Sequence, residues 1–156
     1  LPDSQMDRFI ARLSLGYPAP NEEVNMVMDR QEGNPLHKLT PLLTSENLVA
    51  MQEEVERTYI QGSVVKYIVD LIVGTRINEN IARGASPRAT LAVTAMAKAM
   101  ARLHGRDYVL PDDVQEVFTT TIAHRLILST KAEARNLTAE MVLAEILKQV
   151  PAPRMY

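Results

Sequence analysis

The chain has 156 residues, of which 46% are hydrophobic and 23% charged, and its formal net charge is −2. This is enough apolar material for one ordinary folded domain, or one domain with an appendage. The small negative charge argues against a nucleic-acid binder that works by bulk electrostatics, which needs clustered Lys and Arg. No apolar run approaches the roughly 20 residues of a membrane-spanning helix. The absence of Cys excludes disulfides and favours a reducing, cytoplasmic location.

The first part of the chain predicts a strand, a helix and a connector. Ile10–Leu15 largely alternates apolar with small or polar residues, which is typical of a strand. The next residues, Gly16–Pro20, interrupt this pattern. A helix is expected from there to about Gly33, because the acidic residues that follow Pro20 favour a first helical turn. Residues 34–43 contain two prolines and are expected to form a connector.

Beyond this connector, the spacing of the apolar residues predicts helices. The first begins at Thr44 or Ser45, and Ser63 is expected to cap the second. Later helices are expected to begin at Pro87, Pro111 and Thr138. Gly105 is expected to end the third helix in the left-handed conformation that favours glycine. The predicted fold is therefore mainly α, a small bundle of about four to five helices preceded by a strand with no visible sheet partner.

Few patterns in the chain carry catalytic chemistry. Its three His are far apart and form no zinc-binding His-Glu-x-x-His pair, so no metal site is predicted. A Gly-x-Ser-x-Gly nucleophile elbow is absent. No Lys follows a Gly, so the Gly-Lys-Ser/Thr pattern of a phosphate-binding loop is absent as well. We therefore expect the chain by itself neither to bind a triphosphate tightly nor to hydrolyse it.

Arg88 is the strongest candidate for a binding residue. It is expected in the first turn of the helix that begins at Pro87, where a cation opposes the helix macrodipole. A positive side chain beside free backbone N–H groups forms an anion site, and a bound phosphate would offset the unfavourable position. The alternative is a surface ion pair with a nearby acid. On a helical projection, Arg88 heads the line of Ala92, Ala95 and Ala99, which is expected to be the packing face.

Other charged residues are assigned structural roles by the sequence alone. Arg8 is one charge in a polar segment, and Asp7 could neutralise it. The run Gly105–Tyr108 predicts a turn with a pair between its own Arg and Asp. His124 and Arg125 are expected to close a helix, where cations suit the macrodipole.

A set of short motifs gives the chain a family resemblance. In order along the chain they are Leu1-Pro-Asp-Ser-Gln-Met-Asp-Arg-Phe9, Leu15-Gly-Tyr-Pro18, Tyr67-Ile-Val69 with Thr75-Arg76, Gly84-Ala-Ser-Pro-Arg-Ala89, Gly105-Arg-Asp-Tyr-Val109, Pro111-Asp-Asp-Val114 and His124-Arg125. This ordered set, covering most of residues 1–128, resembles the MoxR family of AAA+ ATPases. The resemblance implies the end of an ATPase core over residues 1–18, a helix and connector over 19–43, the helical lid domain over 44–150 and a tail over 151–156.

The resemblance also implies roles for particular residues. Arg8 corresponds to the arginine finger, which reaches the γ-phosphate bound by a neighbouring subunit. Arg88 corresponds to the sensor-2 arginine of the lid, with Ser86 and Pro87 beside it in the nucleotide site. The implied parent binds ATP and Mg²⁺, forms a homo-oligomeric ring, expected to be a hexamer, and matures or remodels client proteins in a chaperone-like way. Its implied partners carry von Willebrand factor A domains.

The chain departs from the family pattern in one respect, and two alternatives remain open. It lacks the Walker A, Walker B and sensor-1 elements, which the resemblance places in the parent's N-terminal core. One alternative is a stand-alone helical protein-interaction module without nucleotide, and the other is the lid of a magnesium-chelatase-like or helicase-like AAA+ protein. The near-neutral charge disfavours a helicase. The motif Gly84-Ala-Ser-Pro-Arg-Ala89 separates an ATPase lid from the stand-alone module.

Overall fold

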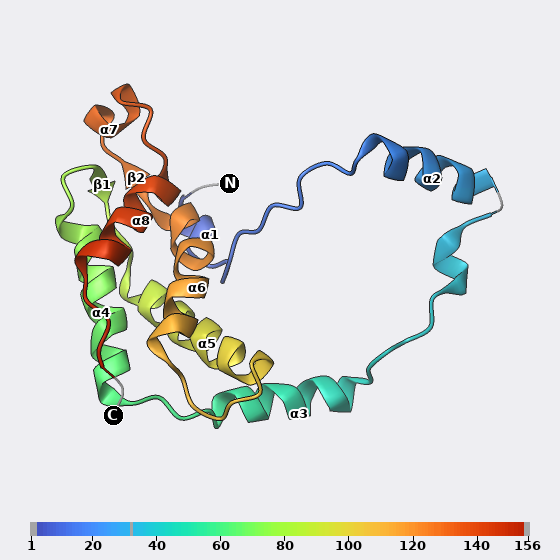
Figure 1. Ribbon diagram of the computed structural model, residues 1–156, viewed down its shortest axis with the longest axis horizontal. Coiled ribbons are helices and arrows are strands. Elements are labelled where there is room, and N and C mark those ends of the chain that lie inside the picture. Colours follow the sequence, from blue (N-terminus) through green and yellow to red (C-terminus); the bar gives the residue numbers. More distant parts are fainter. Residues whose placement is uncertain (1–2, 32, 155–156) are drawn as a thin grey trace. The chain divides into compact units, whose positions relative to one another are not determined.

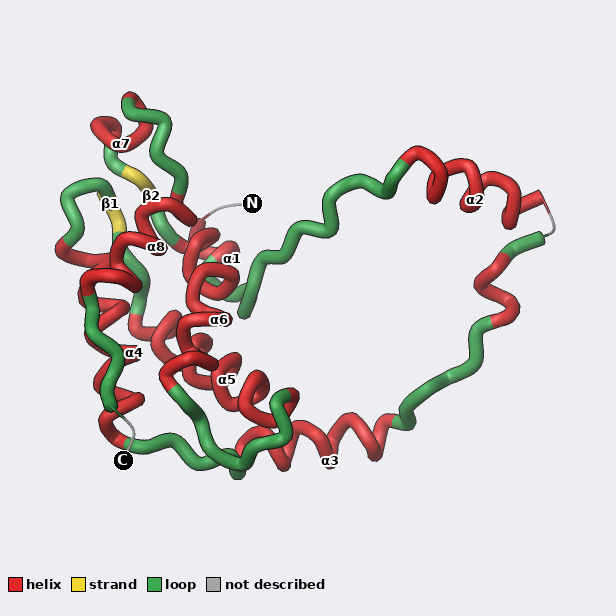
Figure 2. Tube along the Cα trace, in the orientation of Figure 1, coloured by secondary structure: helices red, strands yellow, loops and turns green. Residues whose placement is uncertain are grey.

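The structure, a computed structural model, describes residues 3–31 and 33–154, which form two units (Figure 1). The larger unit joins the N-terminal residues through Arg12 to the chain from Gln52 onward, and Leu13–Met51 form the smaller unit. Helices dominate both units (Figure 2), and the predicted, mainly α fold is confirmed. No helix among the described residues is long and apolar enough to cross a membrane. The division into parent domains at residues 18, 43 and 150 stays a prediction.

The larger unit contains most of the helices and both strands. They are α1 (Asp3–Met6), the end of α3 (Ser45–Glu56), α4 (Gly62–Ile77), β1 (Ile81–Arg83), α5 (Pro87–Leu103), α6 (Pro111–Ile122), the 3₁₀ turn η2 (Ala123–Arg125), β2 (Ile127–Leu128), α7 (Thr130–Ala134) and α8 (Ala139–Gln149). The strands β1 and β2 pair antiparallel. This small sheet and α7 were not predicted, because segments of two to five residues show no apolar periodicity.

The core of this unit lies among α4, α5, α6 and α8. The buried face of α5 consists of small residues four positions apart, namely Ala89, Val93, Ala97 and Ala101. Small side chains allow a close approach of a neighbouring helix, and α5 packs most extensively against α6. Phe118 of α6 is fully buried in the same cluster. The α5–α6 pair is therefore the most extensively packed helix pair of the unit.

The predicted packing face of α5 is wrong by one residue. Ala95 is exposed, whereas Ala92 and Ala99 are only partly buried. Successive helical residues are rotated by about 100°, so burying Ala89 directs Arg88 towards solvent. Arg88 therefore lies beside the packing face rather than at its head.

Two helix termini test the predicted caps. Gly105 has φ = 72° just beyond the end of α5, which confirms the glycine expected there. Ser63 does not cap α4, because the helix begins at Gly62 and Gln61 occupies the capping position. Because α4 begins one residue before Ser63, this serine lies in the first turn of the helix. Its hydroxyl is buried there without a hydrogen-bond partner.

The strand expected over Ile10–Leu15 is not formed. Residues 11–19 have no regular secondary structure, and Arg12 N–H donates to the Thr120 carbonyl at 3.0 Å instead. A strand is stable only when a neighbouring strand accepts and donates its backbone hydrogen bonds. In the described part of the chain the only sheet is β1–β2, and it does not include this segment.

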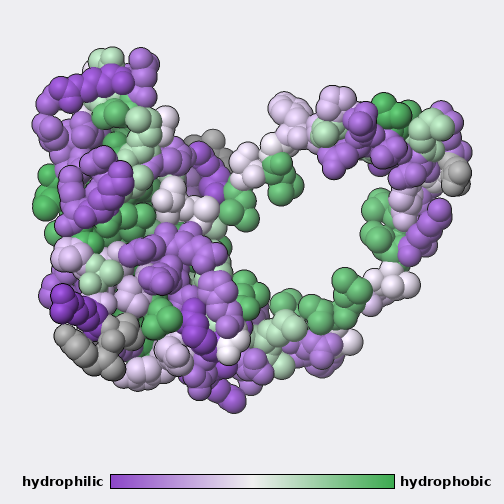
Figure 3. Space-filling view, viewed as in Figure 1, coloured by the Kyte–Doolittle hydropathy of each residue, from purple (hydrophilic) through white to green (hydrophobic). Residues whose placement is uncertain are grey.

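The smaller unit exposes most of its apolar side chains. It contains α2 (Pro20–Gln31), the 3₁₀ turn η1 (Pro35–Lys38) and the first residues of α3. The predicted start of α2 is confirmed, and Glu22 accepts a hydrogen bond from the Ala19 N–H at 2.9 Å. No residue of α2 is buried, and hydrophobic side chains are visible along its surface (Figure 3). This unit therefore has no core of its own among its described residues.

Candidate functional site

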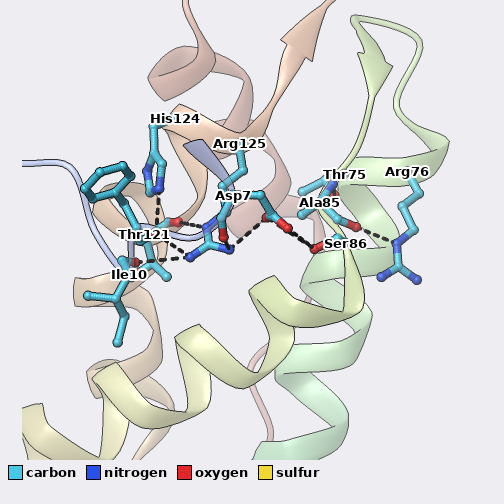
Figure 4. Close-up of polar contacts among 10 residues, drawn as sticks. Asp7, Ile10, Thr75, Arg76, Ala85, Ser86, Thr121, His124 and Arg125 are labelled. Carbon is cyan, nitrogen blue, oxygen red and sulfur yellow. Dashed lines mark hydrogen bonds and ion pairs between the residues drawn. The ribbon is translucent and has the colours of Figure 1, made fainter. Parts of the chain in front are cut away.

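A buried arginine binds the backbone of the segment that carries Arg8 (Figure 4). The Arg125 side chain, from η2, is only 2% exposed. Its Nη1 donates to the Asp7 carbonyl at 2.8 Å and to Asp7 Oδ1 at 2.9 Å. Its Nη2 donates to the Phe9 carbonyl at 2.6 Å, and its Nε to the Thr121 carbonyl at 2.9 Å. One guanidinium thus joins the N-terminal segment to the last turn of α6.

His124 supports the same segment. Its Nε2 lies 3.0 Å from the Phe9 carbonyl, which can only accept, so Nε2 carries a proton and donates it. His124 and Arg125 close the end of α6 as expected, but both are buried there, which the expectation did not include. A sequence signal was present: the pair lies in the otherwise apolar stretch Ile122–Leu128. Charged residues inside an apolar run are buried only with specific partners.

Asp7 connects this segment to the start of α5. The Ser86 hydroxyl donates to its carboxylate, with distances of 3.0 and 3.2 Å to the two oxygens. The alternative in which Asp7 neutralises Arg8 is therefore wrong, because its carboxylate already binds Arg125 and Ser86. Ser86 is the N-cap residue of α5 but forms no side-chain cap. Its hydroxyl is used for Asp7, and the first turn of α5, with Arg88, follows directly.

Both candidate arginines lie at the surface. Arg8 and Arg88 are exposed, and neither guanidinium forms a hydrogen bond or ion pair with residues 5–31 or 33–154. The surface ion pair considered for Arg88 is thus not formed with any described acid. Both side chains are available to a ligand outside this chain.

The turn that leads into α5 is fixed by the end of α4. Thr75 Oγ1 accepts from the Ala85 N–H at 3.0 Å, and Arg76 Nε donates to the Ala85 carbonyl at 2.8 Å (Figure 4). A Cβ atom on Gly84 would lie 2.7 Å from both Arg76 Cα and the Thr75 carbonyl oxygen. Only glycine permits this approach of two backbones. The position of Ser86 therefore depends on α4.

We expect Gly84→Ala to lower the free energy of unfolding by about 1–3 kcal/mol, because the added methyl group must displace backbone rather than a flexible side chain. Urea unfolding followed by circular dichroism measures this change. Gly62→Ala is the matched control, since a Cβ there meets nothing within 4 Å. Equal unfolding midpoints for the two variants would show that the turn tolerates a side chain.

A second polar cluster joins the end of α5 to the start of α6. The predicted pair of Arg106 with Asp107 is wrong, since Arg106 donates to Asp113 at 2.5 and 2.8 Å. The Asp113 carboxylate also accepts from the Leu110 N–H at 2.8 Å and lies 3.1 Å from His104 Nδ1. Burial acts to raise the pKa of Asp113, but these hydrogen bonds outweigh it and lower the pKa. The ionised carboxylate therefore anchors α6, whose other end leads into η2.

Comparison with known proteins identifies the bundle. Residues 73–146 match the family model described as the AAA lid domain. The chain is 36% identical over 153 residues to YeaC of Bacillus subtilis, covering 98% of this chain and 48% of that protein. It is 34% identical over 164 residues to the chaperone MoxR1 of Mycobacterium tuberculosis, covering 99% of this chain and 43% of that protein.

A solved structure supports the arrangement of the elements. The crystal structure of a candidate ATPase from Cytophaga hutchinsonii matches with a TM-score of 0.89 and 30% identity. The match covers 99% of this chain and 49% of that one. The chain thus spans about half the length of the relatives that it matches.

Proposed function

Because the chain belongs to the MoxR family of AAA+ ATPases, we propose that its lid module forms part of a longer ATPase that works as a ring. The helical bundle is the AAA+ lid. The rest of the ATPase and the homo-oligomeric, hexameric ring belong to the proposal. The exposed arginine at the start of the central lid helix, which has no described acidic partner, is the observation that carries it.

The start of α5 suits the phosphates of ATP. A helix N-terminus attracts anions, and a bound phosphate offsets the unfavourable position of Arg88 in the first turn. Ser86 leaves the helix without a side-chain cap, and Pro87 has the first helical position. We assign Arg88 to the nucleotide as the sensor-2 residue, with Ser86 and Pro87 beside it. These residues act within the subunit that carries them.

Bound ATP with Mg²⁺ supplies the phosphoryl group that is transferred. No group of three or more His, Cys, Asp or Glu in the described residues is arranged to hold a metal ion. We therefore assign no Mg²⁺ ligand to this chain. Its proposed part in hydrolysis is to provide positive charge at two places.

The second of these charges is Arg8, proposed as the arginine finger. Its guanidinium is exposed and has no hydrogen bond or ion pair with residues 5–31 or 33–154, so it is available to the γ-phosphate held by a neighbouring subunit. A cation placed there stabilises the charge that develops on the transferred phosphoryl group. The buried contacts of the flanking residues hold the backbone while the side chain projects outward.

The biological role follows the relatives. The chaperone name of the Mycobacterium relative supports a chaperone-like maturation or remodelling of client proteins, with a von Willebrand factor A domain protein as the proposed partner. The absence of Cys supports a cytoplasmic location. The AAA lid match favours this function over a stand-alone interaction module. A magnesium-chelatase-like lid has no observation in its favour here.

Arg88→Ala is expected to weaken nucleotide binding by the full-length protein about 10- to 150-fold. A hydrogen bond from a charged donor is worth about 1.5–3 kcal/mol, and each 1.4 kcal/mol corresponds to tenfold in affinity. Titration calorimetry with a non-hydrolysable ATP analogue measures the change.

Arg135→Ala serves as the control, because Arg135 is also exposed but lies at the C-terminal end of α7. It should bind nucleotide like the parent, and both variants should keep the same helical content. Unchanged affinity in Arg88→Ala would remove Arg88 from the nucleotide site.

A further inference from the structure

The contacts around Arg8 assign a role to residues that the proposed function leaves unused. We propose that Arg125 is a positioning residue for Arg8, and that Asp7 links this support to the start of α5 through Ser86. The inference rests on the proposed role of Arg8 as the arginine finger. The inference states which residues position the backbone around Arg8 and which hydrogen bonds connect that backbone to α5, the helix that carries Arg88.

The first step is the burial of Arg125. A guanidinium removed from water is strongly destabilising unless nearly all of its donors are used. Arg125 uses all three of its nitrogens, and most of its acceptors are backbone carbonyls. Two of these, from Asp7 and Phe9, lie on either side of Arg8 in the chain. The planar fork of arginine suits such convergent acceptors, whereas the point charge of lysine does not.

The second step is the isolation of the Arg8 side chain. Since its guanidinium has no hydrogen bond or ion pair with residues 5–31 or 33–154, no polar partner among them holds it, and its direction depends on the backbone that carries it. The Asp7 and Phe9 carbonyls are both held by Arg125, and His124 Nε2 adds a second donor to the Phe9 carbonyl. These bonds fix the backbone on both sides of Arg8. A misplacement of about 1 Å in a reacting arrangement can cost on the order of 10²-fold in rate.

The third step is the connection to α5. The carboxylate of Asp7 receives Arg125 Nη1 at 2.9 Å and the Ser86 hydroxyl at 3.0 Å (Figure 4). Ser86 precedes the first turn of α5, which carries Arg88. A shift of this turn on nucleotide binding would move one of the two donors to Asp7. The structure therefore provides a direct bonded path, through one carboxylate, from the proposed nucleotide sensor to the backbone of the proposed finger.

The test is a double-mutant cycle in the full-length ATPase. Arg125→Lys keeps the positive charge but removes the guanidinium that donates to several carbonyls at once. It should lower kcat by about 10²-fold with little change in KM for ATP. In an Arg8→Ala background, the same substitution should lower kcat by less than about twofold, because Arg125 acts through Arg8. Additive losses in the double variant would overturn the inference, since a general structural role does not depend on Arg8.

A second readout is independent of turnover. Hydrogen exchange measured by mass spectrometry should accelerate in peptides covering residues 7–12 of Arg125→Lys, while peptides from α4 and α5 keep their protection. Arg12→Lys is the matched control, since its pair with Glu140 is exposed and lies on the same segment. It should change neither kcat nor exchange. Accelerated exchange throughout the unit, or none at residues 7–12, contradicts a local positioning role.

Asp7→Asn keeps the test decisive if Arg125→Lys does not fold. This variant keeps the hydrogen bond from Arg125 to the Asp7 carbonyl but removes the negative charge of the side chain that Arg125 and Ser86 share. It should therefore lower kcat in the parent and have little effect in the Arg8→Ala background. Failure of the two proposals can be told apart. If Arg8→Ala itself leaves kcat unchanged, the finger assignment is wrong. If Arg8→Ala abolishes turnover while Arg125→Lys and Asp7→Asn do not reduce it, only the positioning role is wrong.

Discussion

Replacing Arg8 with Ala in the full-length ATPase should reduce turnover by about 10³–10⁵-fold while leaving ATP affinity nearly unchanged. An arginine finger stabilises charge that exists only in the transition state of phosphoryl transfer, so its loss appears in kcat rather than in binding. Steady-state hydrolysis and titration calorimetry on the same preparation separate the two effects. Helical content should not change, because Arg8 is exposed.

Subunit mixing gives the stricter test of this assignment. If Arg8 acts on the nucleotide of the neighbouring subunit, as proposed, Arg8→Ala subunits mixed with a hydrolysis-dead variant should recover part of the activity at mixed interfaces. The Arg12→Ala variant is a suitable reference, because Arg12 lies on the same segment and its ion pair is with the exposed Glu140. Parental turnover by Arg8→Ala, or no recovery in rings shown to be mixed, would refute the finger.

Replacing Asp113 with Ala should lower the free energy of unfolding of the helical unit by about 3 kcal/mol. Removing one partner of a buried ion pair leaves the other without compensation, which typically costs 3–5 kcal/mol. The lower end applies because the Arg106 side chain is 21% exposed and can recover some hydration. Chemical unfolding measures the loss. Asp112→Ala, in the same turn but exposed, should change stability by less than about 0.5 kcal/mol.

The same carboxylate predicts a pH dependence. The pKa of Asp113 is lower in the folded chain than its unfolded value of about 3.9, so folding favours the ionised form. Its contribution is present above that unfolded value and is lost as the pH falls through the lower, folded one. The stability difference between the parent chain and Asp113→Asn should therefore be constant above about pH 5 and shrink in more acidic solution. A difference that grows on acidification would reverse this assignment.

Local sequence patterns predicted the longer helices but not the contacts between distant segments. The starts of α5 and α6 follow from Pro87 and Pro111, because proline suits the first helical position and needs no N–H partner there. Gly105 marks the end of α5 for an equally local reason. The face that α5 buries was misjudged, since it depends on which neighbouring helix approaches.

In the candidate site, too, features set by adjacent residues could be predicted, whereas contacts between distant segments could not. Arg88 could be singled out from its place in a first helical turn, a property of a few adjacent residues. The apolar stretch around Arg125 indicates burial, but its partners could not be predicted, because they lie more than a hundred positions earlier in the chain. The pairing of Asp113 with Arg106 rather than Asp107 with Arg106 likewise depends on how the link between α5 and α6 folds. Charge and spacing alone do not predict whether Arg106 pairs with Asp107 or with Asp113.

Arg125 binds main-chain oxygens of the residues around Arg8 and touches the side chains of neither Phe9 nor Ile10 through hydrogen bonds. Every amino acid offers the same carbonyl group, so substitutions at these two positions leave the acceptors in place. Evolutionary drift at either position can therefore alter the surface beside Arg8 without relocating the arginine itself. The side chains beside Arg8 can thus change while the backbone that carries this exposed charge keeps its geometry.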